Sequence, residues 1–123
     1  MGYESKLYIV EKFDTMIYDD GKRYARVIAM FDMCKIYNLS DVLRHKPETD
    51  CYFYADDGNT RVLQDCYGKP LTEATIKSVI DVLEDIVACG ENYWRIFPLL
   101  ATLKVIEEGK LGNDDIVVLH YGY

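Results

Sequence analysis

Residues 72–90 read TEATIKSVIDVLEDIVACG, and this stretch divides the chain into two halves of different character. Its apolar residues recur at intervals of one and three positions, which places them on one face of an α-helix. They are Ile76, Val79, Ile80, Leu83, Ile86 and Val87. Thr72 is suited to cap this helix, Glu73 lies in its favourable first turn, and Gly90 ends the pattern. The stretch therefore predicts an amphipathic helix that packs against a core.

A second helix and a last strand are expected on the C-terminal side. Pro98 is tolerated only in the first turn of a helix, so the helix should begin near it and Gly109 should lie past its end. Its core-facing residues would be Leu99, Leu100, Leu103 and Ile106. The segment from Asp115 to Tyr121 contains four consecutive aliphatic residues and predicts a short strand.

The N-terminal half has the alternation that is typical of strands. Four strands are expected, at 6–13, 23–37, 51–55 and 60–67, with Asp-Gly turns after the first and the third. Both faces of the 23–37 segment carry apolar residues, so its middle should be covered on both sides. A short helical turn from Asn38 to Leu43, capped by Ser40 and stopped by Pro47, should separate the second and third strands.

These elements predict one α+β domain spanning residues 1–123, which is a usual domain length. The expected order is β-β-β-β-α-α-β. In this arrangement an antiparallel sheet of about four to five strands is packed by the two C-terminal helices.

Charge restricts the partners that the chain can bind. Fourteen Lys and Arg against 21 Asp and Glu give a net charge of −7, which disfavours nucleic acid polymers and anionic membrane surfaces. An anionic ligand would need a local basic pocket, most easily built from the first half. No apolar run approaches the ~18 residues of a membrane span, and charges interrupt residues 1–13, so no signal peptide is expected. The expected location is the cytoplasm of a host cell.

Motifs for metal binding and catalysis are missing from the sequence. The four cysteines form no Cys-x-x-Cys pair, and the two histidines lie far apart, so neither a metal site nor a cofactor is expected. There is no Gly-rich phosphate loop and no Gly-x-Ser-x-Gly motif. The chain is therefore expected to be a binding protein and not an enzyme.

The densest group of candidate binding residues is the segment 91–97, ENYWRIF. Tyr93, Trp94 and Phe97 offer aromatic faces for a base. Arg95 offers a planar fork for phosphate, and Asn92 offers an amide for a base or ribose edge. The alternative is that the aromatic residues fill the gap between two helices and Arg95 pairs with an acid.

Three further candidates lie in the first half. Arg26 belongs to a cluster of three cations at residues 22–26, which is otherwise a charged hairpin tip that discourages edge pairing. Arg61 and Asp65 lie in polar, turn-rich segments that could hold phosphate or ribose, or could simply form turns. The sequence also contains eleven tyrosines, a residue that concentrates at interfaces and around ligands.

Several segments resemble the Thoeris anti-defence proteins of phages, of the first-described type. They are KLYIVEKF at 6–13, YARVIAMFDMCK at 24–35, DGNT at 57–60, YGKPL at 67–71 and NYWR at 92–95. The resemblance implies a non-enzymatic sponge that binds a cyclic ADP-ribose isomer intact and starves the host effector that this signal activates. It also implies homo-oligomers, dimers or hexamers, with pockets between protomers, and capture of cyclic oligonucleotides by some members.

In a sponge of this kind, the aromatic residues of 91–97 would stack the base of the ligand. Arg95, Arg61 and Arg26 would hold phosphate, and Asn92 or Asp65 would read base or ribose edges. Two alternatives stay open. One is an acidic phage protein that inhibits or adapts a host protein by direct binding. The other is a small nucleotide-processing enzyme that uses acidic side chains to bind a metal.

Overall fold

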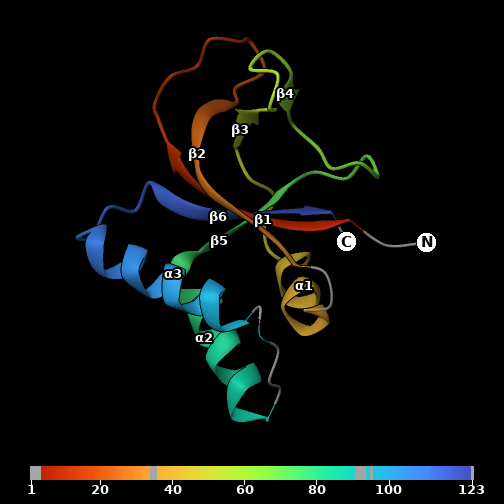
Figure 1. Cartoon of the computed structure of the whole chain (residues 1–123). Helices are drawn as coiled ribbons and strands as arrows, with labels where there is room; N and C mark the ends of the chain where they lie inside the picture. The colour runs from red at the N-terminus through yellow and green to blue at the C-terminus, as the bar shows by residue number, and fades with distance from the viewer. Residues whose placement is uncertain (1–3, 34–35, 91–93, 95, 123) are drawn as a thin grey trace.

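A computed structural model gives the architecture of the chain and describes residues 4–33, 36–90, 94 and 96–122. The elements are listed in chain order. They are β1 (Ser5–Lys12), β2 (Arg23–Asp32), α1 (Tyr37–Leu43), β3 (Cys51–Tyr54), β4 (Arg61–Val62), β5 (Thr72–Thr75), α2 (Ile76–Ala88), α3 (Ile96–Gly109) and β6 (Ile116–Gly122). Three helices pack on one side of a curved sheet, as Figure 1 shows. The α+β class is therefore confirmed.

The sheet differs from the expected one in strand number and direction. Its order is β4-β3-β2-β1-β6-β5, so it has six strands in place of four to five. The pairs β1–β2, β1–β6, β3–β4 and β5–β6 are antiparallel, whereas β2 and β3 are parallel. A parallel pair needs a crossover connection, which α1 and the segment after it provide. The expectation of a purely antiparallel sheet was wrong.

The sheet curls because the segment before β3 also contacts β5. Glu48 forms an antiparallel bridge with Thr72, and the Thr49 N–H donates to the Leu71 carbonyl at 2.9 Å. The resulting curl encloses a second apolar core on the face away from the helices. Its buried members are Val10, Ala25, Cys51, Phe53, Leu71, Val117 and Leu119.

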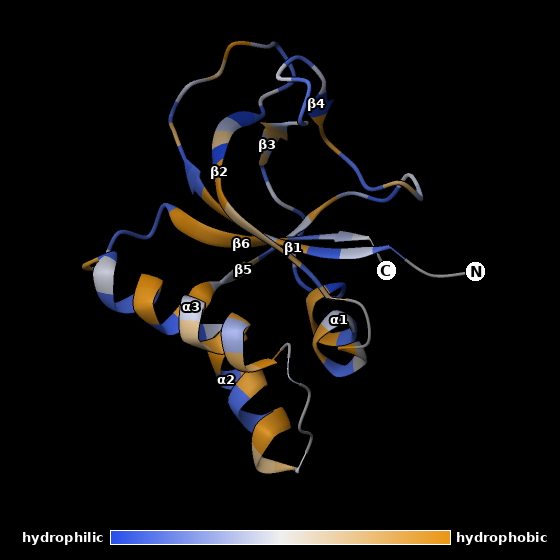
Figure 2. Ribbon diagram, in the orientation of Figure 1, coloured by the Kyte–Doolittle hydropathy of each residue, from blue (hydrophilic) through white to orange (hydrophobic). Residues whose placement is uncertain are grey.

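The main core lies between the sheet and the helices. All five buried residues of α2 belong to the predicted apolar face, namely Ile76, Val79, Ile80, Leu83 and Ile86. In α3 the buried residues are Ile96, Leu99 and Leu103, and Pro98 lies in the first turn as expected. Figure 2 shows apolar and polar segments alternating along both helices, which is the pattern of helices that cover a core on one side only.

The start of α2 and the second and fourth strands were predicted at the wrong places. Residues 72–75 form β5, and Thr75 is the N-cap, accepting a hydrogen bond from the Ser78 N–H at 3.2 Å. The second strand ends at Asp32, and the fourth strand is limited to Arg61 and Val62. Residues 72–75 pair with β6, and this pairing outweighs the tendency of Thr72 to cap a helix.

Two further local expectations were wrong. The middle of β2 is not covered on both sides, because Val27, Ile28 and Met30 are 36%, 46% and 48% exposed. Ser40 does not cap α1, since it lies within the helix and its hydroxyl faces that of Ser5 at 3.1 Å. Among the residues described, no helix has both the length and the apolar composition needed to cross a bilayer.

Candidate functional site

The aromatic segment at 91–97 is only partly described. Asn92, Tyr93 and Arg95 lie outside the described residues. Trp94 is 74% exposed and Phe97, in the first turn of α3, is 46% exposed. Neither side chain therefore fills the gap between helices, which was the alternative interpretation of this segment.

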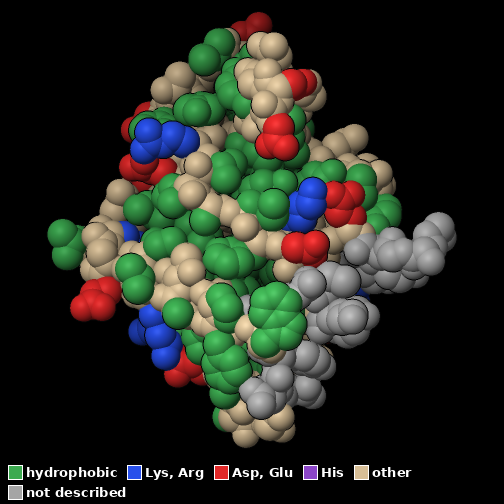
Figure 3. Space-filling model, in the orientation of Figure 1, with side chains coloured by type: hydrophobic (Ala, Val, Ile, Leu, Met, Phe, Trp, Pro, Cys, Tyr) green, Lys and Arg blue, Asp and Glu red, His purple; other side chains and the backbone are tan. Residues whose placement is uncertain are grey.

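Trp94 lines an apolar cleft of about 310 Å³ beside the start of α3. The other lining residues are Phe31, Asp32, Ile36, Pro98 and Leu99. Figure 3 shows hydrophobic side chains reaching the surface over the helical half of this face. The only charged residue in the lining is Asp32, so the described part of the cleft suits an apolar or aromatic group and not a phosphate.

Arg61 is held between aromatic rings and is not directed at solvent. Its guanidinium carbon lies 3.7 Å from the ring centre of Tyr18 and 4.2 Å from that of Tyr52. Its Nη2 donates to Asp20 at 2.7 Å, and the side chain is only 16% exposed. These contacts attach the loop between β1 and β2 to β3 and β4, so Arg61 acts as a structural clamp in this conformation.

Arg26 and Asp65 do not line the cleft beside Trp94. Arg26 lies on β2, where its Nη2 donates to Glu11 at 3.0 Å. Asp65 is buried in the turn before β5, and its Oδ1 accepts hydrogen bonds from the Tyr67 and Lys69 N–H groups at 2.8 and 2.9 Å. The structure therefore does not bring the described candidates into one site within a protomer.

A more suitable site for an anion lies at the C-terminal end of α1. Two neighbouring cavities of about 220 and 420 Å³ share Arg44, Lys69 and Gly122 as lining residues. The first is also lined by Lys46, Glu48, Asp65, Pro70, Thr72 and His120, and the second by His45 and Tyr67. We call these two cavities the basic pocket, because Arg44, Lys46 and Lys69 all line it.

The acidic residues of the basic pocket are already engaged. Asp65 bonds the backbone of its own turn, and Glu48 lies 3.5 Å from the ammonium of Lys22. Arg44 pairs with Asp41 of α1. Lys46 and Lys69 form no ion pair with any described residue. Two lysine ammonium groups can therefore turn to an incoming anion without breaking an ion pair.

His120 lies in the wall of the pocket and is 3% exposed. Its Nε2 is 3.2 Å from the Ser5 hydroxyl, which in turn contacts Ser40. Burial lowers the pKa of His120 to about 4, helped by the charge of Arg44 and opposed by that of Asp65. The imidazole is therefore neutral at neutral pH, and the positive charge of the pocket comes from the lysines and Arg44.

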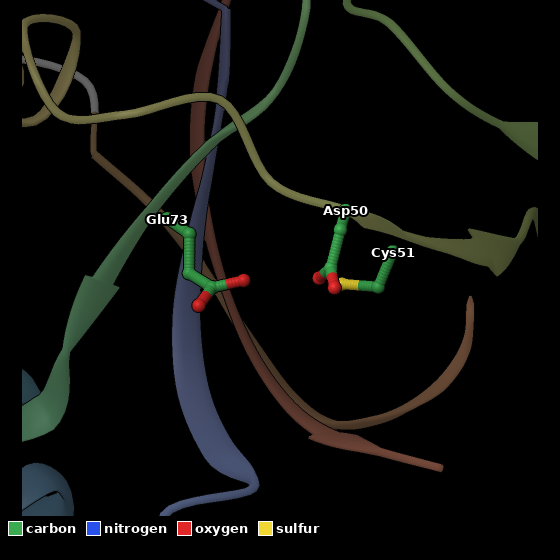
Figure 4. A group of neighbouring side chains, drawn as sticks. All are labelled: Asp50, Cys51 and Glu73. Carbon is green, nitrogen blue, oxygen red and sulfur yellow. The ribbon is translucent and has the colours of Figure 1, made fainter. Parts of the chain in front are cut away.

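Three potential metal ligands lie close together elsewhere, on the segments that close the sheet. Asp50, Cys51 and Glu73 place ligand atoms within 4.8 Å of one another, as Figure 4 shows. The Lys12 ammonium lies 3.1 Å from Glu73 and 3.6 Å from Asp50, and the Thr49 hydroxyl donates to Glu73 at 2.7 Å. Burial raises the pKa of the Cys51 thiol, which keeps it protonated. Lys12 thus already provides the positive charge that a metal would bring.

The basic pocket was missed in the sequence because its residues come from three separate segments, 44–48, 65–72 and 120–122. The signal was the run Arg44-His45-Lys46 before Pro47, together with Lys69 before Pro70. The bridge between Glu48 and Thr72 brings these two runs of sequence together. No family model, curated protein or solved structure matches this chain.

Proposed function

We propose that the chain is a non-enzymatic sponge that binds a cyclic nucleotide immune signal, a cyclic ADP-ribose isomer or a cyclic oligonucleotide, at the basic pocket. Binding would keep the signal from the host effector that it activates, in the host cytoplasm. The observation that carries the proposal is a pocket lined by Arg44, Lys46 and Lys69 in a chain of net charge −7. Such a local concentration of cations supports recognition of an anionic ligand.

The chemistry of the lining supports a nucleotide in particular. Lys46 and Lys69 would contact phosphate oxygens, and the half-exposed ring of Tyr67 would stack on a base. The larger cavity, about 420 Å³, falls within the usual range of small-molecule sites, roughly 300–1,000 Å³. The pocket is open at the surface, so a second protomer could complete it, in line with the homo-oligomer that the family resemblance implies.

His120 supports binding without turnover. A general base works best when its pKa lies near the operating pH, whereas the pKa of His120 is about 4. Its Nε2 also already contacts Ser5, which is buried. The described pocket therefore supports a role in holding a ligand intact and gives little support to a nucleotide-processing enzyme.

A second candidate function, inhibition of a host protein by direct binding, has its own supporting observation. Met16, Ile17 and Tyr18 are consecutive and are 59%, 65% and 40% exposed. An exposed apolar run of this kind is typical of interaction surfaces. The two candidates are separated by testing for small-molecule binding first.

The test is isothermal titration of the purified protein with cyclic ADP-ribose isomers and cyclic oligonucleotides, followed by heating and chromatography of the released ligand. Tight binding with release of the unchanged molecule is expected. Lys46→Ala and Lys69→Ala should each weaken binding about tenfold or more, since each removes a charge-assisted contact. Lys104→Ala is the matched control, because Lys104 lies on α3 near Glu84 and outside the pocket.

Three outcomes would overturn the proposal. The first is absence of binding by every cyclic nucleotide, which would favour the protein-binding function. The second is release of a cleaved product, which would indicate an enzyme. The third is equal affinity in the two pocket variants and the control, which would place the ligand elsewhere, with the Trp94 cleft as the next candidate.

A further inference from the structure

One edge of β2 is open along most of its length. The strand pairs with β1 over nearly its whole length, but with β3 only through Arg23 and Tyr24. Within the described part of the chain, no strand pairs with the outer edge of β2 beyond Tyr24. An open edge of this length is a template for another strand.

Apolar side chains lie exposed on the face of this edge that points away from the helices. Met30 is opposite Tyr8 of β1. Val27 is opposite Val10, and both β1 residues belong to the second core. Val27 and Met30 are 36% and 48% exposed, and Ile28, the extra residue at the register shift of the β1–β2 ladder, is 46% exposed. A strand added at the edge would cover this apolar surface.

The other face of the same edge contains the cleft beside Trp94. Phe31 follows Met30 in the strand and is opposite Leu7 of the main core, so it faces the helices. Phe31, Trp94 and Pro98 are among the residues that line this apolar cleft of about 310 Å³. Successive residues of a strand point to opposite faces. A strand beside β2 would therefore direct one side chain into the cleft and the next onto Met30.

The backbone of β2 has the right direction for such a pairing. The Met33 N–H donates to the Ser5 carbonyl at 2.8 Å, towards β1. Because backbone groups alternate in direction along a strand, the N–H and carbonyl of Met30 point to the open side. An added strand can exchange hydrogen bonds with Met30 without disturbing the β1–β2 ladder.

Acidic side chains predominate among the described residues beside this edge. Lys6 is held by Glu4 at 2.7 Å. Arg26 is held by Glu11 at 3.0 Å. Two further acids lie nearby, because Asp32 is on the same face as Met30 and the charge of Asp56 adds to burial in raising the pKa of Tyr8. In a chain of net charge −7, these surroundings favour a partner with basic residues.

We propose that β2 is a docking edge for an extended segment of a partner protein, which adds to the sheet as an antiparallel strand along residues 29–32. Antiparallel pairing is the more stable arrangement. The segment carries an aromatic or large aliphatic residue opposite Phe31 that enters the Trp94 cleft, an apolar residue opposite Met30 and a basic residue opposite Asp32. Backbone bonds supply affinity, and the side chains on the two faces supply specificity.

This docking edge is independent of nucleotide binding. The basic pocket is lined by residues of 44–48, 65–72 and 120–122, none of which belongs to β2. The docking edge also differs from the exposed apolar run at residues 16–18. Failure of the experiments below would therefore leave the proposed nucleotide site unaffected, and failure of the nucleotide titration would leave the docking edge unaffected.

The probe is a synthetic peptide, Thr-Lys-Phe-Val-Thr-Val, with a neutral fluorophore at its N-terminus and an amide at its C-terminus. In the proposed register its lysine, phenylalanine and first valine are opposite Asp32, Phe31 and Met30. Fluorescence anisotropy should show saturable binding of one peptide per chain. Replacing the lysine of the peptide by glutamate should weaken binding about tenfold, because it brings a like charge towards Asp32.

Methylation of the peptide backbone distinguishes strand addition from a simple apolar contact. In an antiparallel pair with Met30, the N–H of the first valine points to β2, whereas the N–H of the phenylalanine points to solvent. Methylating the valine nitrogen should therefore weaken binding about tenfold or more, and methylating the phenylalanine nitrogen should have little effect. Equal effects of the two methyl groups, or the reverse order, would overturn the proposed pairing.

Variants of the protein test the two faces of the edge. Met30→Lys and Trp94→Ala should each weaken peptide binding about tenfold and leave the unfolding temperature unchanged, because both side chains are exposed. Val105→Lys is the matched control, since Val105 is 69% exposed on α3, and it should bind the peptide as the natural protein does. Absence of saturable binding, or equal affinity in the control and the two variants, would overturn the proposal.

Discussion

The imidazole Nε2 of His120 on β6 and the hydroxyl of Ser5 on β1 are 3.2 Å apart, at the buried wall of the basic pocket. Ser5 also contacts the hydroxyl of Ser40 at 3.1 Å, so the three side chains join the sheet to α1. This chain of contacts is neutral as long as His120 carries no second proton.

Protonation of His120 should destabilise the fold in mild acid. Its pKa is about 4 in the folded chain and 6.5 in an unfolded one, so the unfolded chain binds a proton first as the pH falls. The stability contribution of the neutral imidazole is full above pH 6.5 and is lost between 6.5 and about 4. The difference in pKa corresponds to about 3 kcal/mol in the free energy of unfolding. Urea unfolding at a series of pH values measures it.

His120→Gln provides the comparison for this pH effect. Glutamine keeps a polar group near Ser5 but does not titrate, so the loss of stability above pH 4.5 should shrink markedly. The carboxyls with lowered pKa values, those of Glu4, Asp20 and Asp57, titrate below this range. An identical pH profile for the variant would show that His120 is not the group responsible.

Replacing Arg61 should weaken the fold and leave ligand affinity unchanged. Arg61→Ala removes a guanidinium that lies between two tyrosine rings and bonds Asp20, at an expected cost of about 2–4 kcal/mol. Arg61→Lys keeps the charge without the planar stacking, so its free energy of unfolding should lie between those of the natural protein and Arg61→Ala. Loss of nucleotide binding with no change in stability would instead support the sequence-based expectation that Arg61 holds phosphate.

Tyr52→Phe is a useful companion variant. The Tyr52 hydroxyl is buried and has no hydrogen-bond partner among the described residues, while its ring contacts Arg61. Removing an unsatisfied hydroxyl and keeping the ring should leave the free energy of unfolding unchanged or raise it by about 1 kcal/mol. A clear loss of stability would indicate that a bound water or ligand satisfies this hydroxyl in solution.

Val79→Asp should prevent folding. Val79 is completely buried on α2, and an aspartate there would place an unpaired charge in the main core. Val105→Asp makes the same chemical change at a position on α3 that is 69% exposed, and it should shift the free energy of unfolding by only about 0.5 kcal/mol. Circular dichroism during heating distinguishes the two. A cooperatively folded Val79→Asp would contradict the assigned core face of α2.

Lys12 should be more important for stability than a surface lysine. Burial works to lower its pKa, but the hydrogen bond and charge of Glu73 outweigh burial and raise it. Lys12→Met leaves Glu73 without its cation and should cost about 2 kcal/mol. Lys12→Met combined with Glu73→Gln should recover part of this loss. Zinc should leave the unfolding temperature of the natural protein unchanged, and a large rise would show that Asp50, Cys51 and Glu73 bind metal.

The helical half of the fold could be predicted from local pattern. The apolar positions of α2 and the place of Pro98 in α3 depend on periodicity and on the chemistry of the first turn, both of which are local. The β1–β2 hairpin and β6 were also predicted in outline, because alternating or continuous apolar residues follow clear turn signals. These elements make up most of the main core.

The remainder depends on contacts between distant residues. Nothing local shows that the segment before β3 pairs with Thr72, yet this pairing makes 72–75 a strand and not the start of a helix. The parallel pairing of β2 with β3 likewise depends on where α1 directs the chain. For the candidate site, residue type alone could not show that Arg61 packs between the rings of Tyr18 and Tyr52 and stabilises the fold in place of binding phosphate.

The pairing that curls the sheet also has a consequence for how the pocket moves. The Thr49 and Glu73 amides bond carbonyls across the gap, to Leu71 and Pro47, so the two walls of the basic pocket share backbone hydrogen bonds. The walls therefore cannot separate without partial unfolding of the sheet. A ligand that bridged them would add to these bonds and slow hydrogen exchange at the two amides, and it would enter and leave through the open mouth of a pocket whose walls keep their spacing.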